Sequence, residues 1–314
     1  MNLAVWTCFA LLLTGLPRPL PLGQSSEHGT KDNPYIISSA ADLTDLAKAV
    51  NEEGRSFRNQ WFVQSSDIDL AGVDFIPIGT FDSQAHFEGI YDGDGHVLKN
   101  LSINRVDNAG LFGALGGVVM NLGIESGNIH GACTGAFSSH SSSSDALIFN
   151  CYNKANVSGG RAGGIADNFN GTILSCYSDC VLSGGEIGGL VSYAAARISF
   201  SFCANNEPFP PGVNIGQNCY RVATEESSQT AEKLNQSLYS VSTHGLAFSN
   251  ANTWISEAGE LKQKGKAQFD LWRYLGANWL NLLPYGFAFL SISGICVGWG
   301  IGVNKAKKKA QNEE

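Results

Sequence analysis

Short apolar stretches alternate with polar turns through the middle of this chain, and the pattern repeats. Each unit contains a small residue, a Gly and an apolar pair, then a polar turn, a short apolar stretch near a Cys, and a second polar turn. Three such units cover residues 135–159, 163–184 and 188–208. Their cysteines, Cys151, Cys176 and Cys203, are 25 and 27 residues apart. A repeat in this range, with short strands and no helical stretch between them, is typical of a solenoid.

A right-handed parallel β-helix is the solenoid that the pattern favours. Leucine-rich repeats have a similar period, but the Leu spacing that they require is absent. In a β-helix, equivalent positions of successive coils stack about 4.8 Å apart. We therefore expect an all-β fold in which the three cysteines form one column. The Asn-Leu pairs at Asn100 and Asn121, 21 residues apart, indicate an earlier pair of coils.

The stretch Asp92-Gly93-Asp94-Gly95-His96 raises the question of a calcium site. An EF-hand that began at Asp92 would need an oxygen ligand at His96, a glycine at Val97 and a glutamate at Ile103, and none of these is present. We expect a structural corner instead. There, Gly93 and Gly95 would take positive φ, and the Asp side chains would accept hydrogen bonds from nearby backbone N–H groups.

The segments on either side of the repeats are expected to close the stack. Residues 24–60 would form an N-terminal cap, with a short helix that places Leu43, Leu46, Ala47 and Val50 on one face. Residues 61–220 would be the β-helix. Residues 221–281 would form a C-terminal cap and a juxtamembrane stalk, for which a helix is one interpretation. Caps are needed because an open terminal coil exposes unpaired backbone groups.

The two ends of the chain predict a surface location. Residues 1–23 are typical of a signal peptide, although no Lys or Arg precedes the apolar run. Residues 282–303 are apolar and long enough to cross a bilayer as one helix. The basic tail 304–314 follows, which places the C-terminus in the cytoplasm and residues 24–281 outside.

Two alternatives to a plain membrane span stay open. The first is a buried core helix. The second is sortase attachment to a cell wall, because Leu283-Pro284-Tyr285-Gly286 lacks only the Thr of that signal. A GPI anchor does not fit, since the chain continues past its apolar stretch with charged residues.

Composition agrees with an extracellular solenoid. The 314 residues include 37 Gly, only 15% are charged, and the formal net charge is −8. A negative chain whose basic residues gather only in the tail argues against nucleic acid as a partner. Four sequons, at Asn100, Asn156, Asn170 and Asn235, would accept N-glycans in a host that makes them.

The cysteines allow more than one interpretation. Six of the eight fall between the signal peptide and the span: Cys133, Cys151, Cys176, Cys180, Cys203 and Cys219. An even number in an oxidising compartment permits three disulfides, in any of fifteen connectivities. For the column of three we favour free buried thiols, because aligned side chains on neighbouring coils approach poorly for a bridge. The spacing of Cys176 and Cys180 lacks the second pair that a zinc finger requires.

The units 163–184 and 188–203, with the lead-in from Asn33 to Ile124, resemble the GLUG repeat. This repeat is found in large secreted surface proteins and beside IgA-cleaving peptidases. The resemblance covers about residues 33–220, and it implies a surface or adhesin-like module without catalytic residues. The chain departs from the larger members in its brevity, its cysteine content and the lack of a recognisable peptidase domain.

Three functions compete on this evidence. The first is a membrane-tethered binding or adhesion module for a glycan or surface protein, with the ligand unknown. The second is a carbohydrate-active lyase or hydrolase, and the third is a passive spacer. We expect no catalytic, cofactor-binding or metal-binding residues, because no charged pair recurs at one position in adjacent coils. The charged residues considered, mostly in expected turns, are Asp145, Arg161, Asp167, Asp179, Glu186 and Arg197.

Overall fold

The computed structural model describes residues 28–81, 85–193, 197–199, 201–203, 220–221, 254–257 and 260–263. The expected signal peptide 1–23, the span 282–303 and the tail 304–314 lie outside the described residues, as does most of 221–281. Within the described part of the chain, no helix is long and apolar enough to cross a membrane.

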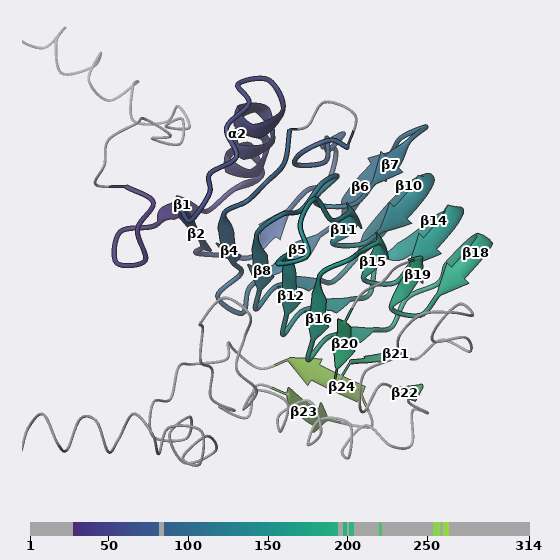
Figure 1. Cartoon of the computed structure of the whole chain (residues 1–314). Helices are drawn as coiled ribbons and strands as arrows, with labels where there is room; N and C mark the ends of the chain where they lie inside the picture. The colour runs from purple at the N-terminus through teal and green to yellow at the C-terminus, as the bar shows by residue number, and fades with distance from the viewer. Residues whose placement is uncertain are drawn as a thin grey trace, which may run out of the picture.

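The described residues form an all-β solenoid of about six turns, as the repeat predicted. Short strands stack into parallel sheets along one axis, from the purple N-terminal coil to the green C-terminal ones (Figure 1). We number these sheets I to IV in the order in which the chain visits them.

Sheets I and II line two neighbouring sides of the solenoid. Sheet I consists of β1 (Tyr35–Ile37), β2 (Trp61–Gln64), β4 (Ile90–Asp92), β8 (Val118–Met120), β12 (Leu147–Phe149), β16 (Thr172–Leu174) and β20 (Arg197–Ser199). Sheet II consists of β3 (Ile68–Asp69), β5 (Val97–Lys99), β9 (Gly123–Ile124), β13 (Tyr152–Asn153), β17 (Tyr177–Ser178), β21 (Phe202–Cys203) and β22 (Tyr220–Arg221).

Sheets III and IV complete each coil. Sheet III consists of β6 (Leu101–Asn104), β10 (Gly127–Gly135), β14 (Asn156–Gly163) and β18 (Leu182–Gly188), with β7 (Asn108–Ala109) also paired to β10. Sheet IV consists of β11 (Ser138–His140), β15 (Ala166–Asn168) and β19 (Val191–Tyr193). One coil therefore runs β8, β9, β10, β11 and then returns to sheet I at β12.

The coil length is not constant along the stack. Val118 pairs with Leu147, and Leu147 pairs with Thr172, so successive coils contain 29 and then 25 residues. Asn100 and Asn121 are not equivalent positions, contrary to the expected repeat. Asn100 follows sheet II, whereas Asn121 follows sheet I. The two Asn-Leu pairs are therefore at different corners of the coil, and that part of the interpretation was wrong.

Aromatic rings stack through the interior of the N-terminal half. The ring of Phe62 lies 4.9 Å from that of Tyr35 and 5.6 Å from that of Phe87, and the rings of Phe87 and Phe112 are 5.1 Å apart. All four side chains are buried in the main core. The rings come from different positions of the coil, since Phe62 pairs with Tyr91 and Phe87 pairs with Leu115. Together they fill the interior, because protein cores are close-packed.

Residues 92–96, where a calcium site or a structural corner was considered, form the corner between sheets I and II. Asp92 Oδ1 accepts hydrogen bonds from the Asp94 N–H at 2.9 Å and from Asn121 Nδ2 at 2.9 Å. Asn150 Nδ2 in turn donates to Asn121 Oδ1 at 2.8 Å, so a ladder of side chains climbs this corner. The structural corner is confirmed, because Asp92 Oδ1 accepts hydrogen bonds from the Asp94 backbone and from the Asn121 side chain.

One detail of the corner differs from expectation. Asp94 and Gly95 take positive φ, at 53° and 83°, whereas Gly93 does not. A β-carbon at Gly93 would lie 2.5 Å from the carbonyl oxygen of Asn121, in the next coil. Gly93 is therefore required for the close approach of two coils and not for a left-handed turn.

The N-terminal helix occurs where it was expected, as α2 (Ala40–Asn51). The Ser39 hydroxyl accepts a hydrogen bond from the Asp42 N–H at 3.3 Å, which satisfies one of the free donors at the helix start. Leu43, Leu46 and Val50 are fully buried and belong to the main core of the solenoid. The apolar face of α2 is thus anchored to the N-terminal coils (Figure 1).

The helical interpretation of the stalk is wrong over the part that the structure describes. β23 (Trp254–Glu257) and β24 (Glu260–Gln263) pair antiparallel as a hairpin. Trp254 and Ile255 are aromatic and β-branched, residue types that favour strands.

Candidate ligand-binding face

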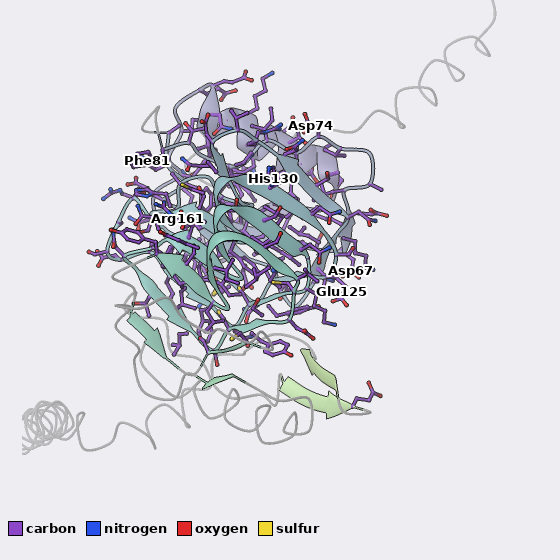
Figure 2. The ribbon with its side chains drawn as sticks, turned by 90° about the vertical axis from the view of Figure 1, so that its right-hand side faces the viewer. Asp67, Asp74, Phe81, Glu125, His130 and Arg161 are labelled. Atoms are coloured by element: carbon purple, nitrogen blue, oxygen red, sulfur yellow. The ribbon has the colours of Figure 1, made fainter. Side chains whose placement is uncertain are left out.

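Sheets III and IV together present one face of the solenoid, which we call the III/IV face. It consists of two rows of residues that pair in register on neighbouring strands, with Phe81 at its N-terminal end. The rows are Cys133, Arg161 and Glu186 from sheet III, and His140, Asn168 and Tyr193 from sheet IV. Phe81 and Arg161 lie on one side of the molecule in Figure 2, and Asp67 and Glu125 lie on the other.

A buried carboxylate holds the two sheets together at this face. The Arg161 guanidinium donates to Asp167 from Nε to Oδ1 at 2.9 Å and from Nη2 to Oδ2 at 2.8 Å. The Ser192 hydroxyl donates to Asp167 Oδ1 at 2.6 Å, and the Asp167 side chain is fully buried. Hydrogen bonding to Asp167 raises the pKa of Arg161 above its usual value, so the guanidinium stays charged. Arg161 is therefore fixed in direction by a bidentate pair.

The same guanidinium contacts a thiol and an aromatic ring. Arg161 Nη2 lies 3.1 Å from Cys133 Sγ, and Arg161 Cζ lies 5.1 Å from the centre of the Tyr193 ring. Burial raises the pKa of the Cys133 thiol, and the Asp167 charge raises it further. Cys133 is thus a neutral thiol at physiological pH and a poor nucleophile. The Tyr193 ring is stabilised over a fixed cation.

Exposed rings continue the face toward the N-terminus. Tyr193 is 57% exposed and Phe81 is 50% exposed. The Phe81 ring stands edge-on to the His140 ring, with their centres 4.2 Å apart. Burial lowers the pKa of His140, and the nearby His86 lowers it further, so the imidazole is neutral at physiological pH. This end of the face is therefore aromatic and uncharged.

A small pocket adjoins Phe81. Its volume is about 180 Å³, and its walls include Ile76, Thr80, Arg105 and Asn108. Asn108 pairs with Cys133, which places the pocket at the N-terminal end of the sheet III row. Rings, a fixed cation and a pocket thus occur along one side of the solenoid. That combination suits a ligand with both apolar faces and hydroxyl groups.

The opposite side of the molecule differs in chemistry. Lys99 Nζ lies 3.1 Å from Asp67, and Lys154 Nζ lies 3.0 Å from Glu125. The Tyr152 hydroxyl also donates to Glu125 at 2.5 Å. Charges there compensate one another, and the pairs are surface interactions that contribute little binding potential.

Four of the six charged residues considered from the sequence lie in strands and not in turns. They are Arg161 in β14, Asp167 in β15, Glu186 in β18 and Arg197 in β20. Arg161 and Glu186 also share one register position in adjacent coils, contrary to expectation. The sequence could not show the Arg161–Asp167 pair, because the bend between β14 and β15 creates it.

The expected cysteine column is correct for two members and wrong for the third. Tyr152, Tyr177 and Phe202 pair in register, so the residues before them, Cys151, Cys176 and Ser201, occupy one position. Cys203 instead pairs with Ser178, two residues further along the coil. The backbone period here is constant at 25 residues, whereas the cysteine spacing is not.

The described cysteines are all free thiols: Cys133, Cys151, Cys176, Cys180 and Cys203. Cys219 lies outside the described residues. Cys151 and Cys176 are fully buried and donate to carbonyl oxygens of their own coils, Phe149 at 3.2 Å and Leu174 at 3.4 Å. They pack as small apolar residues.

We expect Cys151 and Cys176 to resist iodoacetamide in the folded protein and to react once the chain is unfolded. Burial raises the pKa of Cys151 well above its usual value, which suppresses the reactive thiolate. Peptide mapping by mass spectrometry measures the modification with and without denaturant, so that each thiol serves as its own comparison. Rapid modification of Cys151 without denaturant, or a Cys151–Cys176 disulfide, would contradict the buried-thiol interpretation.

Three of the four sequons lie on exposed residues, Asn100, Asn156 and Asn170, and Asn235 lies outside the described residues. Asn100 Nδ2 donates to Asp69 at 2.8 Å, and Asn156 Nδ2 donates to Asn128 at 3.1 Å. In the part of the chain that the structure describes, no group of three or more His, Cys, Asp or Glu could hold a metal ion.

Comparison with known proteins gives partial matches. No family model matches the chain, so the resemblance to GLUG repeats stays a prediction. The crystal structure of a "putative immunoglobulin A1 protease" from Bacteroides ovatus has a TM-score of 0.49 and 20% identity, covering 75% of this chain and 94% of that one.

Two curated proteins have higher sequence identity over shorter stretches of this chain. Halomucin of Haloquadratum walsbyi is 36% identical over 114 residues, which is 33% of this chain and 1% of that protein. A "Putative Gly-rich membrane protein" of Evansella cellulosilytica is 34% identical over 134 residues, which is 39% of this chain and 15% of that protein. Each match thus covers 33–39% of this chain and only a short segment, 1–15%, of a much longer protein.

Proposed function

We propose that this chain is a cell-surface binding module whose III/IV face holds an extended polysaccharide. The observation that carries the proposal is the set of exposed rings, Phe81 and Tyr193, on either side of the fixed guanidinium of Arg161. Sugar rings present apolar C–H faces that pack on aromatic rings, and their hydroxyls accept hydrogen bonds from a guanidinium. A β-solenoid repeats its surface about every 4.8 Å, which suits a ligand that itself repeats.

Binding is favoured over hydrolysis by the state of the carboxylates. Asp167 is fully buried and bonded to both Arg161 and Ser192, so it is not available as a general acid or base. Glu186 is exposed and shares its register position with a cation, not with a second carboxylate. Glycoside hydrolysis requires two carboxylates on either side of the scissile bond.

Attachment to a membrane is part of the proposal. Residues 282–303 would form a single span, with residues 24–281 outside and the tail 304–314 in the cytoplasm. The relative named as a Gly-rich membrane protein supports a membrane setting. The module would then hold its ligand at the cell surface without consuming it.

Replacing Tyr193 with alanine is expected to weaken glycan binding about two- to tenfold, since one aromatic contact contributes about 0.5–1.5 kcal/mol. The measurement is binding of the full-length chain to a glycan array, with a parallel assay for released reducing ends. Val181→Ala is the matched control, because Val181 is 67% exposed but lies between sheets II and III.

The outcomes separate the three functions. Saturable binding without cleavage, lost in Tyr193→Ala and kept in Val181→Ala, supports the binding module. Release of reducing ends would support the enzyme. No binding to any glycan would support the passive spacer and refute the proposal.

A further inference from the structure

A second cavity, larger than the pocket beside Phe81, opens at the N-terminal end of the solenoid. Its volume is about 660 Å³. Two segments on either side of α2 form it, the loop before β1 and the loop that leads into β2. None of its lining residues belongs to the III/IV face. We propose that this cavity binds an acidic sugar, meaning a saccharide unit that carries a carboxylate or a sulfate.

Positive charge is the first feature that points to such a ligand. Lys31, Arg55 and Arg58 all line the cavity. Arg58 pairs with Glu88 at 2.8 Å, but Lys31 and Arg55 form no ion pair with any described residue. Within the described part of the chain, two cations are thus left without a carboxylate. An anionic group would be attracted to these cations, although the net charge of the chain as a whole is −8.

Aromatic rings hold these two cations in place. Lys31 Nζ lies 5.5 Å from the centre of the Trp61 ring, and Arg55 Cζ lies 4.3 Å from the centre of the Phe57 ring. A cation over a ring is oriented while its hydrogen-bond donors stay free. The cavity therefore offers pre-positioned donors, which lowers the entropy cost of binding.

An unsatisfied acceptor is the second, independent feature. Gln60 lines the cavity, and its Oε1 is buried without a hydrogen-bond partner among the residues that the structure describes. A buried polar atom that lacks a partner is costly, so a donor from a ligand would be favourable. Sulfate and a simple carboxylate have no O–H to give at neutral pH, whereas a sugar has several. Cationic donors together with an unsatisfied acceptor select a ligand that carries both an anion and hydroxyls.

The backbone of this loop is held in a rare conformation. Phe57 and Asn59 have φ values of 54° and 61°, in the left-handed region that a bulky side chain such as Phe seldom adopts. Such conformations cost about 1–3 kcal/mol and cluster at ligand-binding segments. Phe57 is nevertheless buried, with its ring 5.1 Å from that of Phe62 in the core. Core packing thus fixes the loop that carries Arg55, Arg58 and Gln60.

The test measures binding of four probes to the full-length chain by isothermal titration calorimetry. The probes are glucuronic acid, glucose 6-sulfate, neutral glucose and inorganic sulfate. We expect the two acidic sugars to bind at least about tenfold more tightly than glucose and than inorganic sulfate, because only they can engage both the cations and Gln60. Their affinity should also fall as the salt concentration rises.

Variants assign that binding to this cavity. The double variant Lys31→Gln/Arg55→Gln is expected to lose about tenfold or more in affinity for both acidic sugars. Gln60→Met should weaken the acidic sugars and leave inorganic sulfate unchanged. Lys48→Gln is the matched control, because Lys48 is an exposed lysine of α2 outside the cavity. A thermal melt of each variant checks that the solenoid stays folded.

Three results would overturn the inference: glucose binding as tightly as glucuronic acid, inorganic sulfate binding as tightly as glucose 6-sulfate, or no change in the double variant. The inference does not depend on the polysaccharide site proposed above. Tyr193→Ala should leave these affinities unchanged, so failure at one site can be distinguished from failure at the other.

Discussion

Replacing Asp167 with alanine is expected to lower the free energy of unfolding by about 3–5 kcal/mol, since breaking one side of a buried ion pair leaves the other charge uncompensated. Arg161 would lose its hydrogen bonds to Asp167, and the Ser192 hydroxyl would lose its acceptor. Because Arg161 is 30% exposed and can be partly rehydrated, we expect the lower end of that range. Urea denaturation followed by tryptophan fluorescence measures the change.

Two comparisons make this prediction specific. Asp74→Ala removes an exposed carboxylate that pairs with Arg105 at 3.1 Å, and it should change stability by less than about 1 kcal/mol. The double variant Arg161→Met/Asp167→Leu should recover much of the loss, because no charge remains buried. Equal effects of Asp167→Ala and Asp74→Ala would show that the buried pair does not join sheets III and IV.

Replacing Phe112 with alanine is expected to lower the free energy of unfolding by about 3–5 kcal/mol, through lost burial and the cavity that remains. The Phe112 ring is fully buried, 5.1 Å from Phe87 and 6.1 Å from Tyr91. Because these rings connect successive coils, the cavity would fall between coils that the backbone ladder holds at a fixed spacing. Little collapse is therefore possible. Equilibrium denaturation measures the loss.

Phe81→Ala is the companion to this variant. Phe81 is also a Phe, but it is half exposed on the III/IV face, so its replacement should cost less than about 1 kcal/mol of stability. It should nevertheless reduce glycan binding, whereas Phe112→Ala should retain binding in whatever fraction stays folded. A binding loss only in proportion to the unfolded fraction, in both variants, would contradict a role for Phe81 in recognition.

Repeat length and local pattern predicted the parts of this fold that depend on neighbouring residues. Ser39 and the spacing of Leu43, Leu46 and Val50 specify a capped amphipathic helix whatever surrounds it, and α2 is present. The Asp-Gly content of 92–96 specifies a tight corner. The ladder on that corner was missed, although a signal exists: Met120-Asn121-Leu122 and Phe149-Asn150-Cys151 each place Asn between apolar residues.

Errors arose where side chains were aligned without the backbone. The spacing from Cys176 to Cys203 exceeds the 25-residue period of the strands by two residues, so the two cysteines do not share a position. Matching Asn100 to Asn121 placed two different corners in one column. In both cases the residue types were similar but the register was set by strand pairing, which sequence spacing alone does not report.

By itself, the sequence determined the class of the fold and the approximate length of its coils, since apolar alternation and Gly-rich turns are local properties that each coil carries. Only the tertiary structure decided which side chains share a face. Arg161 meets Asp167 because the chain bends between β14 and β15, and Lys31 meets Trp61 because β1 pairs with β2 across the length of α2. Such contacts depend on register and on bends between strands. They arise only when the coils have stacked.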